Sequence, residues 1–166
     1  MGLVSNENIQ VISSVSGGAW FSSVFMFQNK WNDSTLLGSP TNISQLTLDN
    51  LDFLSPGKLG ESLTASSNVI AEDLYEQGIQ TYYLWEATMN ELFLVPFELG
   101  NVSQFMAASK QQVEEIIKRN PALSEDQFLI QNENRPRNFL MGGTLQAPLF
   151  YRTEASNVAY FQMSPG

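Results

Sequence analysis

The sequence of 166 residues contains no cysteine and no histidine. Without cysteine it can form neither a disulfide nor a thiolate nucleophile. Without histidine the commonest general base is missing, so these residues alone cannot form a Ser-His-Asp triad. A metal would find only oxygen ligands, because imidazole and thiolate are both absent. We therefore expect no metal site and no cofactor.

Basic residues are also few, with 8 Lys and Arg against 17 Asp and Glu and a formal net charge of −9. Such a chain has no basic footprint for a phosphate backbone, so we expect no nucleic acid partner. Charged residues make up only 15% and hydrophobic residues 43%. This balance is typical of a folded domain rather than a disordered segment, and the length predicts one domain.

Long hydrophobic runs are missing too. The most apolar stretch, residues 15–27, contains Ser and Gly and is too short to span a bilayer. Residues 1–13 lack the basic start and apolar centre of a signal peptide. The sequence therefore predicts neither a membrane span nor a signal peptide.

The first predicted elements are a strand, a tight turn and a helix. Residues 9–15 are rich in β-branched residues and uncharged, which predicts a half to fully buried strand. Residues 16–18 read Ser-Gly-Gly and predict a turn, and residues 19–30 predict a helix that is buried on most faces. A strand, a glycine turn and a buried helix are typical of the start of an α/β unit.

Helices dominate the predicted middle of the chain, and strands its end. We expect helices over 66–77, 79–94 and 102–119, the last capped by Asn101, and a short helix within 46–54. Strands are expected over 138–141, ending at Gly142-Gly143, and over 157–163. The resulting organisation is 1–30 (strand and helix), 31–134 (mostly helical insertion, with 66–119 at one edge of the sheet) and 135–166 (two strands).

Ser16 stands at the one place where this pattern suggests chemistry. A serine on a sharp turn between a buried strand and a buried helix is the arrangement of a nucleophile elbow. Gly17 would supply the backbone N–H next to the nucleophile, and small residues such as Gly18 would avoid collisions with the strand or helix. The alternative is a plain strand-to-helix turn, since Ser14 replaces the first Gly of a strict G-x-S-x-G elbow. A trypsin-type site fits less well, because the preceding Gly-Asp is absent.

Three stretches in order carry a resemblance to a known family. Ser16-Gly17-Gly18-Ala19-Trp20 resembles the nucleophile region of the cytosolic phospholipase A2 and lysophospholipase (phospholipase B) group, which is related to the patatins. Residues 135–145 (RPRNFLMGGTL) and 160–166 (YFQMSPG) are similar to two segments that follow the elbow in these enzymes.

The resemblance implies a partial patatin-like α/β sheet with flanking helices and a serine hydrolase that uses a Ser/Asp dyad without histidine. It assigns Ser16 as nucleophile, with Gly17 and Gly18 as elbow and oxyanion neighbours. The implied substrates are phospholipids or lysophospholipids on a membrane surface, which favours a cytoplasmic protein that associates peripherally with membranes. The family's catalytic Asp precedes a Gly, and no Asp of this sequence does. We therefore expect an internal fragment of a catalytic domain, inactive alone, with the Asp and a Gly-rich oxyanion loop outside it.

Several alternatives remain open from the residues. The protein is an acyl hydrolase, a non-catalytic α/β module for lipid or protein binding, or a small domain with an accidental Ser-Gly-Gly turn. Aromatic residues of the middle segment line an acyl-chain tunnel or form helix core: Tyr82, Tyr83, Trp85, Phe93 and Phe97. Residues Phe21, Phe25, Met26 and Phe27 are expected to pack beneath the sheet. Arg135, Arg137 and Arg152 meet a lipid phosphate or are solvated at the surface.

Overall fold

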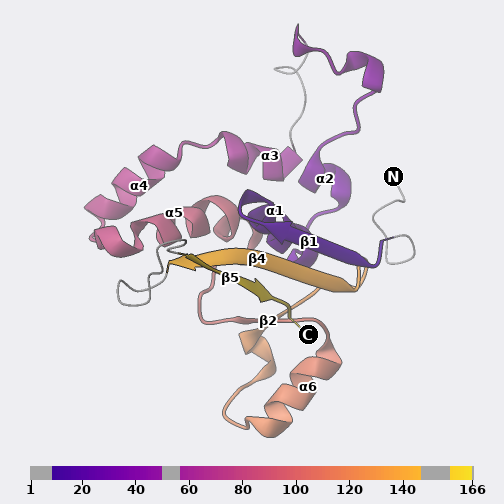
Figure 1. Ribbon diagram of the computed structural model, residues 1–166, viewed down its shortest axis with the longest axis vertical. Coiled ribbons are helices and arrows are strands. Elements are labelled where there is room, and N and C mark those ends of the chain that lie inside the picture. The colour runs from indigo at the N-terminus through magenta and orange to yellow at the C-terminus, as the bar shows by residue number, and fades with distance from the viewer. Residues whose placement is uncertain (1–8, 50–56, 147–157, 166) are drawn as a thin grey trace. The chain divides into compact units, whose positions relative to one another are not determined.

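A computed structural model describes residues 9–49, 57–146 and 158–165 of the chain (Figure 1). Over these ranges the fold is mixed α/β, with six helices and two small sheets. The predicted α/β class is thereby confirmed at this level. None of the described helices is long and apolar enough to cross a membrane.

The chain folds as two compact units. The first comprises Met1–Phe27 together with Val102–Gly166, and the second comprises Gln28–Asn101. The described segment 102–134, expected within the helical insertion, thus groups with the strands of the first unit.

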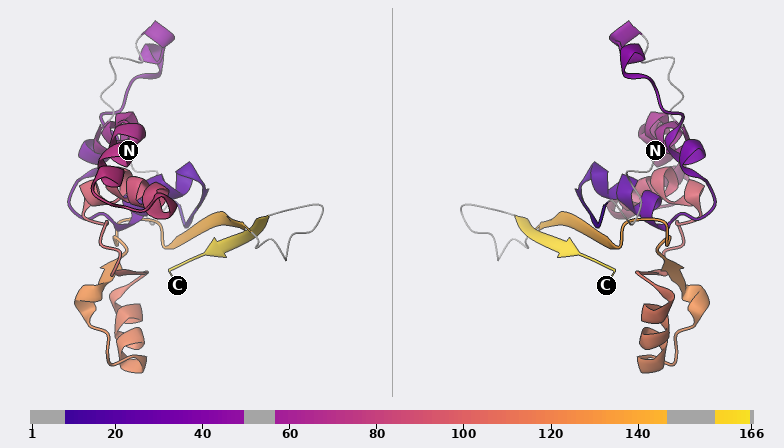
Figure 2. Two further views of the ribbon diagram at one scale, coloured as in Figure 1. Left: turned by 90° about the vertical axis from the view of Figure 1, so that its left-hand side faces the viewer. Right: turned by 90° about the vertical axis from the view of Figure 1, so that its right-hand side faces the viewer.

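The larger sheet belongs to the first unit and has the strand order β1-β4-β5 (Figure 1). Figure 2 shows its β4 and β5 strands, in orange and yellow, from two further sides. Strand β1 (Val11–Val15) runs parallel to β4 (Asn138–Gln146), and β4 pairs antiparallel with β5 (Val158–Met163). The strands expected over 138–141 and 157–163 are therefore present. Since β4 continues through Gly142 and Gly143, the prediction that it ends there is wrong.

Gly143 has a steric role in this sheet rather than a strand-ending one. It lies directly opposite Phe161 of β5. A Cβ atom added at Gly143 would lie 2.6 Å from a carbon of the Phe161 ring. The absence of a side chain at this position therefore makes room for the ring across the strand pair.

Helix α1 (Gly17–Phe27) supplies much of the buried surface of the first unit. Its second half is buried from Ser22 to Phe27, and the Phe27 ring packs edge-on against Phe139 of β4 with centroids 6.0 Å apart. Phe25, Met26 and Phe27 are buried as expected, whereas Phe21 is 42% exposed.

Strand β1 differs from its prediction in burial. It occupies the expected place, but Val11 is 45% and Val15 62% exposed, so full burial of this strand is wrong. Both valines lie on the same face of β1, because alternate residues of a strand point to opposite sides. The described residues cover the other face better, which places Ile12 and Ser14 at intermediate exposure.

The helix predicted over 102–119 is correct only in its second half. Helix α6 spans Lys110–Arg119 and is capped by Ser109, whose Oγ accepts a hydrogen bond from the Gln112 N–H at 3.2 Å. Residues Phe105–Ala107 form strand β2, which pairs in parallel with β3 (Phe128–Ile130). Asn101 is therefore not the cap. A small core of Ala107, Val113 and Phe128 joins these three elements.

The second unit contains α2 (Asp33–Leu37), α3 (Gly57–Thr64), α4 (Ser67–Glu76) and α5 (Leu84–Phe93). Helix α4 matches the predicted helix 66–77. It ends in a Schellman motif, in which the N–H groups of Gly78 and Ile79 donate to the carbonyl oxygens of Tyr75 and Leu74. Helix α5 begins later than expected, since residues 81–83 form a 3₁₀ turn. The helix expected within 46–54 falls largely outside the described residues.

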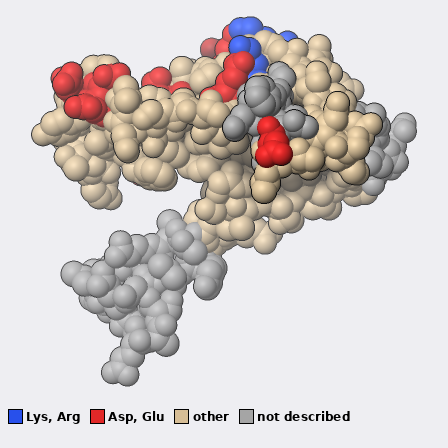
Figure 3. Space-filling view, turned by 90° about the horizontal axis from the view of Figure 1, so that it is seen from above, with Lys and Arg blue, Asp and Glu red and all other residues tan. Residues whose placement is uncertain are grey.

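Acidic side chains are prominent on the molecular surface. They gather in separate clusters on the face drawn in Figure 3, most of which is otherwise uncharged. On α4, Glu72, Asp73 and Glu76 are all exposed. This distribution agrees with the formal net charge of −9.

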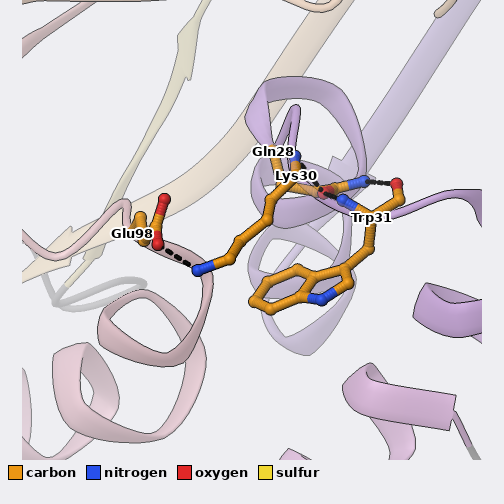
Figure 4. Close-up of polar contacts among 4 residues, drawn as sticks. All are labelled: Gln28, Lys30, Trp31 and Glu98. Carbon is orange, nitrogen blue, oxygen red and sulfur yellow. Dashed lines mark hydrogen bonds and ion pairs between the residues drawn. The ribbon is translucent and has the colours of Figure 1, made fainter.

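The start of the second unit is held by the side chain of Gln28 (Figure 4). Gln28 is fully buried, its Oε1 accepts from the N–H groups of Lys30 and Trp31, and its Nε2 donates to the Trp31 carbonyl at 2.8 Å. The Trp31 ring packs edge-on against Phe97 with centroids 5.7 Å apart. Lys30 forms an exposed ion pair with Glu98 (Figure 4).

Candidate active site

Ser16 lies in the turn that joins β1 to α1, as the sequence predicts. Its φ angle is 55°, in the left-handed region, and its side chain is exposed. For a residue other than glycine this backbone costs about 1–2 kcal/mol. The turn therefore holds a reactive type of side chain in a strained conformation, as at a nucleophile elbow.

The amino-terminal end of α1 follows Ser16 immediately. The Ala19 N–H donates to the Ser16 carbonyl at 2.8 Å and closes the first turn. The first N–H groups of a helix, here those of Gly17 and Gly18, have no partner within the helix. Together with the helix dipole they favour negative charge close to the serine.

Glycine is not sterically required at either position after Ser16. A Cβ atom added at Gly17 would meet no described atom within 4 Å, and one at Gly18 would meet only the Ser14 Cβ, at 3.7 Å. The collision expected from the sequence is therefore not observed. The physical reason is that β4 is the only strand beside β1 in the described part of the chain, which leaves the turn open.

Two further serines tie the elbow to strand β4. The Ser14 hydroxyl donates to the Leu140 carbonyl at 3.5 Å. The Ser23 hydroxyl donates to the Ala19 carbonyl at 2.8 Å and lies 3.3 Å from the Met141 sulfur. No motif marks Ser23, and the one available signal for its buried contact is a serine inside an otherwise apolar helix pattern.

The described residues bring no base to Ser16. No described carboxylate forms a hydrogen bond with its hydroxyl. Within the same ranges there is no group of three or more His, Cys, Asp or Glu side chains that could hold a metal ion. The site as described is thus a nucleophile with one side of an oxyanion pocket.

Of the five aromatic residues singled out in the middle segment, only Phe97 is buried. Tyr82 is 83% exposed, Tyr83 52% and Trp85 66%, so helix core is wrong for these three. Phe93 is half-buried, and Phe97 is buried at 2% exposure. They all belong to the second unit, which contains neither Ser16 nor its neighbours.

Arg135 is buried, so the expectation that it is solvated at the surface is wrong. Arg135 is only 5% exposed, and its guanidinium lies over the Phe25 ring at 3.9 Å from the centroid. Arg137 is exposed, and Arg152 lies outside the described residues. The cation–π contact explains how Arg135 is accommodated in the interior.

The chain was also compared with known proteins. No family model matches it, and no match was found among the curated proteins or among the solved structures.

Proposed function

We propose that the protein is a serine acyl hydrolase that cleaves phospholipid or lysophospholipid esters, with Ser16 as nucleophile and a patatin-like α/β core. The observation that carries this is the exposed, left-handed Ser16 between strand β1 and the amino-terminal end of α1. The family resemblance of residues 16–20, 135–145 and 160–166 supplies the substrate class.

The chemistry follows from the turn. The Ser16 Oγ attacks the ester carbonyl carbon, and the negative charge that develops on the carbonyl oxygen is stabilised by the Gly17 N–H and the dipole of α1. A base takes the Ser16 proton and passes it to the alcohol oxygen as the ester C–O bond breaks. The alcohol departs, and the acyl group stays bound to Ser16 as an acyl-serine. Water then hydrolyses the acyl-serine, releasing the fatty acid and restoring the hydroxyl.

The base in this scheme is an Asp supplied from outside the 166 residues. The sequence offers no histidine and no Asp followed by glycine. A hydroxyl without a base is a weak nucleophile, and one missing oxyanion donor typically costs about 10²–10³ in turnover. We therefore expect negligible esterase turnover from the 166 residues alone.

A non-catalytic lipid-binding module is the alternative, and one observation favours it. Tyr82, Tyr83 and Trp85 are exposed next to one another at the start of α5, and the first two rings contact edge-on at 5.0 Å. Exposed Tyr and Trp side chains suit the interface of a membrane, where one end is apolar and the other hydrated. In either case we propose that the protein acts at a membrane surface.

A fluorophosphonate probe and a fluorescent lysophospholipid test the proposal. The protein is the chain together with any sequence that flanks it in its reading frame, and the variants are Ser16→Ala and Ser13→Ala. Ser13 is the matched control, because it is also an exposed serine of the same strand and turn region. We expect labelling and turnover in the wild type and Ser13→Ala, and neither in Ser16→Ala. Turnover that persists in Ser16→Ala refutes the proposal of a hydrolase. If the protein shows no turnover but sediments with lipid vesicles, the alternative of a lipid-binding module is supported.

A further inference from the structure

A second site of the first unit is a cavity between α6, β3 and the segment before β4. Its volume is about 360 Å³, and three cationic side chains line it, those of Lys110, Arg135 and Arg137. This volume is in the lower part of the range for ligand pockets, which suits a small ligand. Because the sequence has only 8 Lys and Arg, three of them around one cavity is a marked concentration in an acidic protein.

The cationic groups are held in two different ways. Arg135 is almost fully buried and stacked on Phe25, so its position is fixed by packing. Lys110 and Arg137 are exposed and form no ion pair with any described residue. One carboxylate, that of Glu133, also lines the cavity, so positive charge remains in excess.

The amino-terminal end of α6 adds to the positive potential. Ser109 and Lys110, the cap and the first residue of this ten-residue helix, belong to the cavity wall. The Ser109 Oγ is already occupied by the Gln112 N–H, whereas the first N–H groups of a helix have no partner within it. A helix end of this kind attracts phosphate groups.

Gln131 is a fixed part of the cavity wall. It lines the cavity and is 7% exposed, and its Nε2 donates to the Pro136 carbonyl at 2.6 Å. Its Oε1 is buried and has no hydrogen-bond partner among the described residues. This acceptor has no surface open to the cavity, so the groups that a ligand can meet are the cationic side chains and the end of the helix.

The segment that carries these groups is fixed before any ligand arrives. The Asn132 N–H donates to the Met26 carbonyl of α1 at 2.9 Å, and the Arg135 N–H donates to the Asn132 carbonyl at 3.0 Å. Gln131 also receives support from its bond to Pro136. A site that needs little reordering loses less free energy on binding.

We propose that this cavity binds a small phosphate ester, through Lys110, Arg135, Arg137 and the amino-terminal end of α6. The dianionic charge of a phosphate monoester matches the excess of cations. The site does not require Ser16 to be a nucleophile, and it goes beyond ester hydrolysis. The ligand chemistry is shared by free glycerol phosphate and by the head group of an anionic lysophospholipid.

Calorimetric titration tests the site with sn-glycerol 3-phosphate, with glycerol as the uncharged control, at low ionic strength. A parallel arm uses sedimentation with vesicles of phosphatidylcholine with and without lysophosphatidic acid. The variants are Arg137→Gln and Lys110→Gln, both exposed, and the matched control is Lys118→Gln, on the last turn of the same helix and outside the cavity.

We expect binding of at least one phosphate probe, none of glycerol, and a loss of about tenfold or more in affinity in each cavity variant. Lys118→Gln and Ser16→Ala should bind like the wild type. Binding of the soluble ester identifies a free ligand, and binding of the vesicles alone identifies a lipid head group. Absence of binding in both arms, or an equal loss in Lys118→Gln, overturns the proposal. A failed hydrolase test leaves these results unaffected.

Discussion

Replacement of Ser16 by glycine should stabilise the protein while removing the proposed nucleophile. The residue has a φ angle of 55°, which costs an L-amino acid about 1–2 kcal/mol and glycine almost nothing. Glycine also has more freedom in the unfolded chain, which offsets about 0.4–1 kcal/mol of that gain. The Ser16→Gly variant should therefore be more stable than Ser16→Ala by about 0.5–1 kcal/mol.

The matched site is Ser13, an exposed residue within strand β1. There glycine should be less stable than alanine by about 0.5–1 kcal/mol, because a strand gains nothing from glycine's freedom. The difference between glycine and alanine thus changes sign over three positions of the chain. Comparing the two pairs cancels the loss of the hydroxyl, since alanine lacks it as well.

Thermal and urea unfolding of the four variants measures this difference. For a chain of this size about 1 kcal/mol corresponds to about 2–4 °C in Tm. We expect Ser16→Gly to melt above Ser16→Ala, and Ser13→Gly to melt below Ser13→Ala. If glycine is less stable than alanine at position 16 by as much as at position 13, the inference of a strained turn is wrong. The main support for a nucleophile elbow is then lost as well.

Four other substitutions test features of the fold, each by urea unfolding. Gly57→Ala should lose about 3 kcal/mol or more, because φ is 64° and a Cβ would lie 2.2 Å from the Gly38 backbone nitrogen; Gly78→Ala, with φ 93° and open space, should lose only about 1 kcal/mol. Val113→Ala should cost about 2 kcal/mol, since Val113 is 1% exposed in the core that α6 forms with β2 and β3. Glu98→Gln should change stability by less than about 0.5 kcal/mol, because both partners of its ion pair are exposed; a larger loss would contradict this account.

The turn at Ser16 could be predicted because it depends on local signals. A β-branched run, a Ser-Gly-Gly turn and an apolar helix pattern follow one another within residues 9–30, and their order decides the structure. The Schellman end of α4 was predictable for the same reason, since Gly78 directly follows the helix. Element boundaries set by such neighbours were close to those observed.

Features that depend on distant partners could not be predicted. Residues 102–108 continue the helical pattern of α6, but Phe105–Ala107 pair with Phe128–Ile130, and this pairing outweighs helix propensity. The burial of Arg135 depends on the Phe25 ring, which comes from α1 at the other end of the first unit's sequence. The residues that line the cavity around Gln131 likewise come from three separate parts of the chain, so no single sequence motif predicts it.

Gly143 and Phe161 are separated in the sequence but lie opposite each other in the sheet, so the substitutions that each position tolerates depend on the other. A methyl group at Gly143 would occupy space that the ring already fills, at 2.6 Å from its nearest carbon. Position 143 can carry a side chain only when the residue at position 161 is smaller than Phe. We therefore expect the two positions to covary among homologous sequences. The pair also favours the observed register of β4 and β5, because a shift of β5 by two residues would bring the Phe161 ring opposite a residue that has a Cβ atom.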